Sequence, residues 1–167
     1  QPKDVVSLLS KLFTDFDKEC NQRKLYKLYT IGDCYVTLSF LDKAHRGSDY
    51  EEAKAQIEMA FALVKIVKKI RNEINFEELA MRIGVHTGSI IGGVLGTDIV
   101  RYDIYGQDVI IANKMESNGD KDKVNVSETT KSLLESNFKT YSFEPNKVVD
   151  VKGKMVQSYF VTHANSE

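Results

Sequence analysis

The sequence has few cysteines, no excess of either charge and no long hydrophobic run. Cys20 and Cys34 are the only cysteines among 167 residues, which excludes a disulfide framework and fits a reducing compartment. Lysine and arginine number 23 against 24 aspartates and glutamates, so the formal charge of -1 gives no basic field to attract nucleic acid. The apolar segment 61–67 is interrupted by Lys65 and is far shorter than the ~20 residues of a membrane span.

The length and composition are typical of one soluble globular domain with its own core. The chain has 42% hydrophobic and 28% charged residues, and we interpret residues 1–167 as a single domain. It shows no signal peptide and no low-complexity tract. The start at Gln1 indicates a fragment, so we expect this domain to be incomplete at its N-terminus.

Two stretches with apolar residues at helical spacing predict amphipathic helices. The first has one apolar stripe, formed by Val5, Leu8, Leu9, Leu12, Phe13 and Phe16. The second runs from Glu51 to about Asn75, and its lysines are expected to solvate the outer face rather than bind a ligand. Between them, residues 25–31 and 35–41 predict a β-hairpin, which a polar loop at 43–50 follows.

The second half of the chain mixes strand-like and helix-like segments. Residues 79–86 alternate, which predicts a strand with Arg82 and His86 on its polar side. The glycine-dense segment 87–96 predicts β structure rather than a phosphate loop, because it lacks a Gly-Lys-Ser/Thr ending. Further strands are predicted at 101–105, 124–126, 139–143, 148–151 and 158–162, and helices at 106–117 and 128–135. This order indicates an α+β sandwich rather than a doubly wound sheet.

Gly32 and Asp33 form the tight turn of the predicted hairpin, because this pair tolerates positive φ at little cost. A carboxylate on such a turn projects past the strand ends, where it can bind a hard cation such as Mg²⁺. The alternative is that Asp33 only forms the turn. The hairpin by itself leaves both interpretations open.

Several motifs then follow one another in a recognisable order. They are Thr30-Ile31-Gly32-Asp33-Cys34-Tyr35, residues 81–88, Gly92-Gly93-Val94-Leu95-Gly96, residues 101–106, residues 112–117 and Val151-Lys152-Gly153-Lys154. Together they resemble the class III nucleotidyl cyclases, which turn ATP or GTP into the 3′,5′-cyclic nucleotide and pyrophosphate. The resemblance covers nearly the whole chain. It implies a ferredoxin-like βαββαβ sandwich, here without its usual first strand, and active sites between two domains arranged head to tail.

In this family two aspartates of one domain hold two metal ions, Mg²⁺ or Mn²⁺. Asp33 matches the second aspartate, which makes it the expected metal ligand and catalytic residue. The first aspartate belongs before Val5, and residues 1–4 do not contain its motif. Gly32 and Arg82 are the expected substrate-binding residues, since Arg82 matches an arginine that contacts the polyphosphate. An ion-pair role for Arg82 remains the alternative.

The partner domain of this family supplies an Asn and an Arg one helical turn apart, which orient the ribose and stabilise charge on the transferred phosphoryl group. The matching residues here are Ile110 and Lys114. Isoleucine donates no hydrogen bond, and lysine lacks the planar fork of arginine. The resemblance therefore implies the metal-bearing half of a heterodimer, which requires a complementary cyclase domain.

The residues that match the base-reading positions are Tyr29 and Asp103. Tyr29 fits neither base set, whereas Asp103 resembles the adenine set, so these two residues do not decide between GTP and ATP. Segments 98–106 and 113–119 most resemble protist guanylyl cyclases in which a P-type ATPase region precedes the cyclase domains. This favours GTP, and it implies a cytoplasmic domain of a membrane-bound parent protein that makes no membrane contact itself.

Two side chains and two other functions complete the interpretation. Lys154 matches a phosphate-binding lysine that serves from the other half, so a solvated turn lysine is favoured here. His86, a lone histidine on a strand, is expected to be structural. A pseudo-cyclase that dimerises to regulate its partner remains an alternative to catalysis. An RNA-binding module is disfavoured, because the aromatic strand signature and basic surface are missing.

Overall fold

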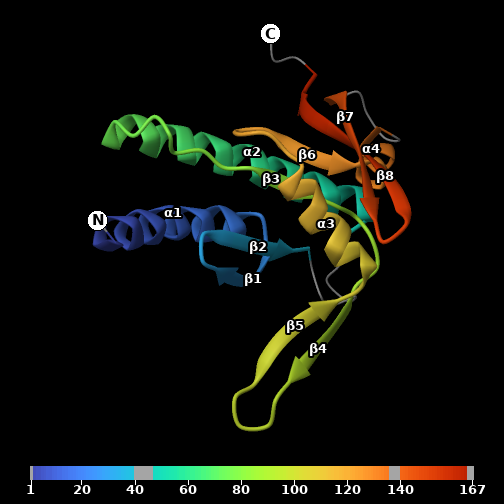
Figure 1. Ribbon diagram of the computed structural model, residues 1–167, viewed down its shortest axis with the longest axis horizontal. Coiled ribbons are helices and arrows are strands. Elements are labelled where there is room, and N and C mark those ends of the chain that lie inside the picture. Colours follow the sequence, from blue (N-terminus) through green and yellow to red (C-terminus); the bar gives the residue numbers. More distant parts are fainter. Residues whose placement is uncertain (1, 40–46, 136–139, 165–167) are drawn as a thin grey trace. The chain divides into compact units, whose positions relative to one another are not determined.

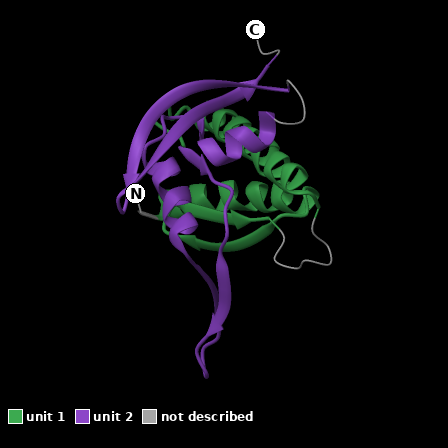
Figure 2. Cartoon of the chain, turned by 90° about the vertical axis from the view of Figure 1, so that its right-hand side faces the viewer, with its two compact units in different colours: residues 1–81 green, residues 82–167 purple. Residues whose placement is uncertain are grey.

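The computed structural model describes residues 2–39, 47–135 and 140–164, which form a mixed α+β fold. The chain divides into two compact units, residues 1–81 and residues 82–167, which Figure 2 shows in two colours. Each unit is described separately. Among the described helices, none combines the length and the apolarity needed to cross a bilayer.

The first unit contains two helices and the predicted hairpin (Figure 1). Its elements are α1 (Pro2–Gln22), β1 (Tyr26–Ile31), β2 (Cys34–Leu38) and α2 (Asp49–Ile74). Tyr35 fixes the hairpin to α1, because its ring contacts Phe13 and Phe16 at centroid distances of 5.5 and 5.4 Å. The Tyr35 hydroxyl also donates a 2.7 Å hydrogen bond to Asp17 on α1.

The boundaries of α2 follow from local capping. The Ser48 side chain accepts from the Glu51 N–H while the Glu51 carboxylate accepts from the Ser48 N–H, which is a capping box. Asn75 ends the helix in the left-handed conformation, with φ 51°. The predicted loop at 43–50 is wrong at its end, because residues 49–50 are helical. Its residues 43–46, and residues 40–41 of the predicted hairpin, lie outside the described residues.

The second unit contains a four-stranded sheet, a separate hairpin and two helices. Its elements are β3 (Ile83–Val85), β4 (Ile91–Leu95), β5 (Arg101–Tyr105), α3 (Gln107–Ser117), β6 (Val124–Ser127), α4 (Glu128–Glu135), β7 (Tyr141–Val151) and β8 (Lys154–His163). The sheet order is β3-β6-β8-β7, with β3 parallel to β6 and the other pairs antiparallel. Among the described strands, β4 and β5 pair only with each other.

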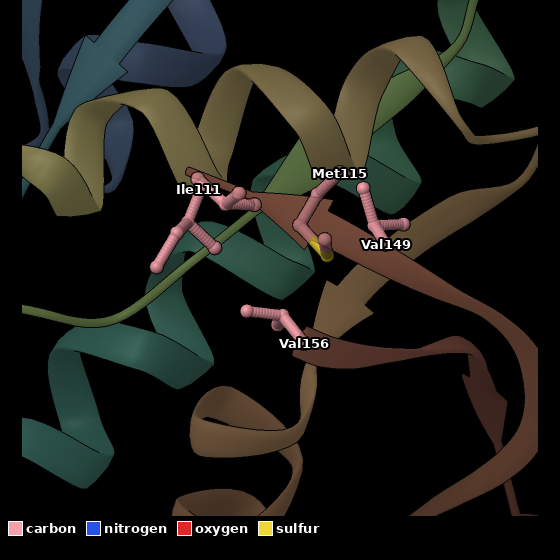
Figure 3. Close-up of a cluster of buried hydrophobic side chains, with 5 residues drawn as sticks. Ile111, Met115, Val149 and Val156 are labelled. Carbon is pink, nitrogen blue, oxygen red and sulfur yellow. The ribbon is translucent and has the colours of Figure 1, made fainter. Parts of the chain in front are cut away.

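A cluster of apolar side chains joins α3 to the β7–β8 hairpin (Figure 3). Ile111 and Met115 come from one face of α3 and are fully buried. Val149, Val151 and Val156 come from the two strands. The four-residue spacing of Ile111 and Met115 places both on one side of the helix, which is why this side faces the sheet.

Several predicted strand boundaries are wrong, and the run predicted at 158–162 is too short, because β8 begins at Lys154. The strand predicted at 79–86 is limited to Ile83–Val85. The separate runs predicted at 139–143 and 148–151 form one strand, β7, although Lys139 lies outside the described residues. A register shift between Pro145 and Val148 explains the break in the pattern, because proline has no N–H for the ladder and a bulge accommodates it. Ser158 satisfies the bulge by bonding both the N–H and the carbonyl of Lys147.

Gly84 brings the backbones of β3 and α3 into close approach. A Cβ atom placed on Gly84 would lie 2.1 Å from the amide nitrogen of Glu116, which is closer than real Cβ atoms come. Gly88 is a second close approach, because a Cβ there would lie 2.3 Å from the carboxyl carbon of Asp108. Glycine is therefore required at positions 84 and 88, where this segment meets α3.

Gly84→Ala tests the first approach. We expect this substitution to lower the free energy of unfolding by about 1–3 kcal/mol, because the backbones must separate to admit the methyl group. Gly93→Ala on β4 is the matched control, since a Cβ there meets nothing within 4 Å. Urea unfolding followed by circular dichroism measures both variants. Equal midpoints for Gly84→Ala and the native chain would contradict the role of Gly84.

Candidate active site

The predicted turn at Gly32 and Asp33 is present in the first unit. Ile31 and Cys34 form the last pair of the β1–β2 ladder, so Gly32 and Asp33 are the two turn residues. Gly32 has φ +59° and Asp33 has no positive φ, the pattern of a type II′ hairpin turn. Asp33 is exposed at the tip. Asp33 is therefore accessible to a solvated cation.

The base of this hairpin is held by charge as well as by ring packing. Lys27 on β1 forms a 2.8 Å ion pair with Asp17 on α1. Burial raises the pKa of Asp17, but the hydrogen bonds from Lys27 and Tyr35 outweigh it, and the net pKa lies below its usual value. Burial and the Asp17 hydrogen bond raise the pKa of Tyr35, so its hydroxyl stays protonated and donates. Tyr29 lies half-buried on β1 beside a register shift in the ladder.

Arg82 lies just before β3 in the second unit, where its Nε donates a 2.9 Å hydrogen bond to Glu116 of α3. Both side chains are about half exposed. Arg82 and Gly84 are two residues apart, and Gly84 is where α3 comes closest. From the sequence, an ion-pair role for Arg82 is the alternative to phosphate binding. The ion pair is present, and Glu116 is the partner that sequence reasoning did not identify.

Ile110 and Lys114 lie together on α3. With Asn113, Glu116 and Ser117 they line a depression of about 310 Å³. Ile110 is partly buried and packs against the cluster of Figure 3. One turn of helix separates it from the exposed Lys114, so the spacing expected of a catalytic Asn and Arg is present with different side chains.

Asp103 and Lys154 lie on other strands of the second unit. Asp103 on β5 accepts from the Ile104 N–H at 2.9 Å and from Arg101 at 2.8 Å. The backbone hydrogen bond, followed by Arg101, lowers the pKa of Asp103. Lys154 begins β8 and is exposed.

His86 joins three elements through a buried polar network that also includes Asp108. The Nε2 atom lies 3.1 Å from Asp108 of α3, and Nδ1 lies 2.6 Å from Ser127 at the end of β6. Only 4% of the His86 side chain is exposed. Asp108 also accepts from the Ser89 N–H at 2.7 Å. The structural role predicted for His86 is consistent with these contacts.

Burial sets the protonation of this network. It lowers the pKa of His86, which the neighbouring Asp108 offsets only in part, and Lys154 lowers it further. Burial raises the pKa of Asp108, yet the bonds from His86 and Ser89 outweigh it, so the net pKa is lowered. At neutral pH the pair is therefore a neutral imidazole beside a carboxylate.

Asp33 meets the chemical requirement for a divalent cation only in part. Mg²⁺ is usually held by one or two carboxylates together with substrate phosphates. Within residues 2–39, 47–135 and 140–164, no group of three or more His, Cys, Asp or Glu side chains is arranged to hold a metal. Asp33 thus fits as one ligand of a site that the nucleotide and another carboxylate must complete.

Comparison with known proteins decides the family. The family model described as "Adenylate and Guanylate cyclase catalytic domain" matches residues 1–163. The chain belongs to this family. The α+β fold predicted from the sequence is confirmed by the guanylate cyclase domain of a Catenaria anguillulae protein solved in complex with GTP. That domain has a TM-score of 0.83 and 26% identity to the cyclase domain described here, covering 98% of this chain and 86% of its own.

Two curated relatives of this cyclase domain come from protists. Guanylate cyclase alpha of Plasmodium falciparum (isolate 3D7) is 42% identical over 163 residues, or 95% of this chain. Guanylate cyclase of Toxoplasma gondii (strain ATCC 50853 / GT1) is 41% identical over 165 residues, or 96% of this chain. The chain spans only 4% of the length of each. The predicted resemblance to protist guanylyl cyclases is confirmed, and the roles of single residues remain predictions.

The cyclase domain is expected to lose stability as pH falls because of His86. The unfolded chain takes up a proton on this histidine at a higher pH than the folded chain, so acidification below its unfolded pKa of about 6.5 favours unfolding. Thermal unfolding between pH 7.5 and 5.5 measures the effect. We expect a smaller decrease in Tm for His86→Gln than for the native chain, with His163→Gln on β8 as control. Equal slopes in all three proteins would be inconsistent with a buried neutral His86.

Proposed function

We propose that this domain is the metal-bearing half of a guanylate cyclase, which forms cyclic GMP and pyrophosphate with a complementary cyclase domain. The observation that carries the proposal is the exposed Asp33 carboxylate on a glycine turn, in a chain that belongs to the cyclase family. The reaction joins the ribose 3′ oxygen to the α-phosphorus, with loss of the hydroxyl proton to solvent, and breaks the bond from that phosphorus to pyrophosphate. Both bonds involve charged oxygens, which a cation near Asp33 would stabilise.

Asp33 would contribute one carboxylate to bind Mg²⁺ or Mn²⁺, with Gly32 allowing the turn that presents it. When bound, such ions stabilise the attacking and leaving oxygens of a phosphoryl displacement. The rest of the site must provide a second carboxylate. Lys27 and Tyr35 both bind Asp17 of α1 and so hold the base of the hairpin, which supports a defined position for the turn.

Arg82 would bind the polyphosphate. Its side chain is half exposed, and the ion pair with Glu116 uses Nε. The four remaining N–H groups can bind phosphate oxygens in pairs. This arrangement is compatible with both interpretations of Arg82, because the ion pair leaves the terminal nitrogens available.

Two features support the need for a second cyclase domain. Helix α3 lacks the Asn and Arg pair, and the β4–β5 hairpin exposes apolar side chains. Ile110 donates no hydrogen bond, and Lys114 lacks a planar fork, so α3 does not supply the transition-state groups. The hairpin exposes apolar side chains on both of its faces and at its loop, namely Ile91, Val94, Leu95, Ile99 and Val100, each more than half exposed. A two-stranded ribbon with such a surface is marginally stable in water, which favours burial against a partner. We assign that surface to the complementary cyclase domain, in the head-to-tail pair.

GTP is the favoured substrate because the relatives that match most of the chain are named guanylate cyclases. ATP is the second candidate, supported by the adenine-like carboxylate of Asp103. Arg101 and the Ile104 N–H already bind that carboxylate, which reduces its capacity to contact a base. Cys20 and Cys34 are not joined in a disulfide, which supports a reducing compartment, as in a cytoplasmic domain of a membrane-bound protein.

Asp33→Ala is the direct test of catalysis. Full-length protein is assayed with GTP or ATP and Mn²⁺, in the presence of a cyclase domain that carries the Asn and Arg pair. We expect cyclic GMP formation to exceed cyclic AMP formation and to fall at least about 100-fold in Asp33→Ala, because a metal ligand is lost. Asp120→Ala, another exposed turn aspartate, is the control. Unchanged turnover in Asp33→Ala would support the regulatory pseudo-cyclase instead.

Ile99→Asp and Val94→Asp test the partner surface. A carboxylate placed in an apolar interface is desolvated without a counter-charge, so we expect partner affinity to fall at least about tenfold. Ile74→Asp, on an exposed position at the end of α2, is the control. Sedimentation of the mixture measures association. If the hairpin variants and the control bind equally well, the β4–β5 hairpin does not contact the partner.

A further inference from the structure

Glu116 is the second residue of the Arg82 ion pair, and neither the sequence motifs nor the family resemblance assigns it a role. We propose that Glu116 is a positioning residue, which holds Arg82 by Nε so that its two terminal nitrogens remain available, as a pair, for the nucleotide polyphosphate. This deepens the proposed function and rests on it. The geometry, the support of α3 and the energetics of the pair carry the inference.

The geometry of the guanidinium separates two edges. Nε–H lies on one side of the planar group, and the two terminal nitrogens form a fork at its end. The bond to Glu116 uses Nε at 2.9 Å. The fork is the edge that matches two phosphate oxygens, so a ligand on Nε leaves bidentate recognition intact.

The position of Glu116 follows from the packing of β3 on α3. Arg82 lies one residue before β3 and two residues before Gly84, beside the point where β3 meets α3. At Gly84 the strand touches the backbone nitrogen of Glu116 itself. The side chain of Glu116 therefore starts from the point of closest approach, within reach of the residue two positions before Gly84.

Polar contacts fix α3 near both ends, which fixes the backbone of Glu116. Near the N-terminus, Asp108 is bound by His86 and by the Ser89 N–H. Near the C-terminus, the fully buried Asn125 donates to the Met115 carbonyl at 2.8 Å. Asn146 donates to the Asn118 carbonyl at 3.0 Å. Glu116 thus lies on a segment whose neighbours on both sides are held.

The exposure of the Arg82–Glu116 ion pair indicates that it orients Arg82 rather than stabilises the fold. Arg82 and Glu116 keep 49% and 37% of their side-chain surface exposed, and such pairs add little to folding free energy. The negative charge of Glu116 also weakens the attraction of this region for phosphate. What the pair provides is a restricted guanidinium, which loses less rotamer entropy when it binds an anion.

A double-mutant cycle tests this proposal in the full-length protein with its partner domain. We expect Glu116→Gln to raise the KM for GTP at least about fivefold, and to weaken binding of inorganic triphosphate by a similar factor in calorimetry. In an Arg82→Ala background, Glu116→Gln should produce no further change, because it acts through Arg82. Glu135→Gln is the matched control, since Glu135 forms a 2.7 Å pair with Lys131 on α4.

Three outcomes would overturn the proposal. A lower KM in Glu116→Gln would mean that Glu116 competes with the nucleotide. If the fold-changes in KM caused by Glu116→Gln and Arg82→Ala multiply in the double variant, Glu116 does not act through Arg82. A decrease in Tm that accounts for the lost activity of Glu116→Gln would show a structural role. Failure of the proposed function is seen separately, as turnover that does not depend on Asp33.

Discussion

The second unit depends on the contact of two backbones, β3 and α3, at Gly84. Because a Cβ atom at this position would lie 2.1 Å from the Glu116 nitrogen, no other residue permits the approach without displacement. The approach sets the height of α3 above the sheet, so that Ile111 and Met115 reach the apolar cluster of β7 and β8. The same approach brings Arg82 to Glu116. One glycine thus governs both the core and the arginine expected to meet the substrate.

Buried polar groups then determine how α3 lies along the sheet. Apolar packing alone is non-directional and tolerates small shifts of a helix. The amide of Asn125 and the imidazole of His86 are specific donors and acceptors near opposite ends of α3, and neither can move without leaving a buried group unsatisfied. The combination of one close backbone approach and two polar contacts gives α3 a single position.

The turn at Gly32 and Asp33 could be predicted from the sequence because its cause is local. Two strand-like runs and a pair that tolerates positive φ are all that a type II′ turn requires. The pairing of Arg82 with Glu116 could not be predicted this way, because 34 residues separate them and the pairing depends on how α3 meets β3. The bulge in β7 escaped prediction for a related reason, since it is satisfied by Ser158 of the neighbouring strand. Family resemblance supplied residue identities, whereas the contacts between elements required the structure.

The buried histidine network has a fixed direction. A carboxylate only accepts, so the neutral His86 ring must carry its proton on Nε2, toward Asp108, and its Nδ1 must accept from the Ser127 hydroxyl. Ser127 in turn accepts from the Thr130 N–H at the start of α4. The chain of donors therefore runs one way, from α4 through β6 and His86 to α3. In this ring orientation, a single imidazole tautomer is consistent with all of these bonds.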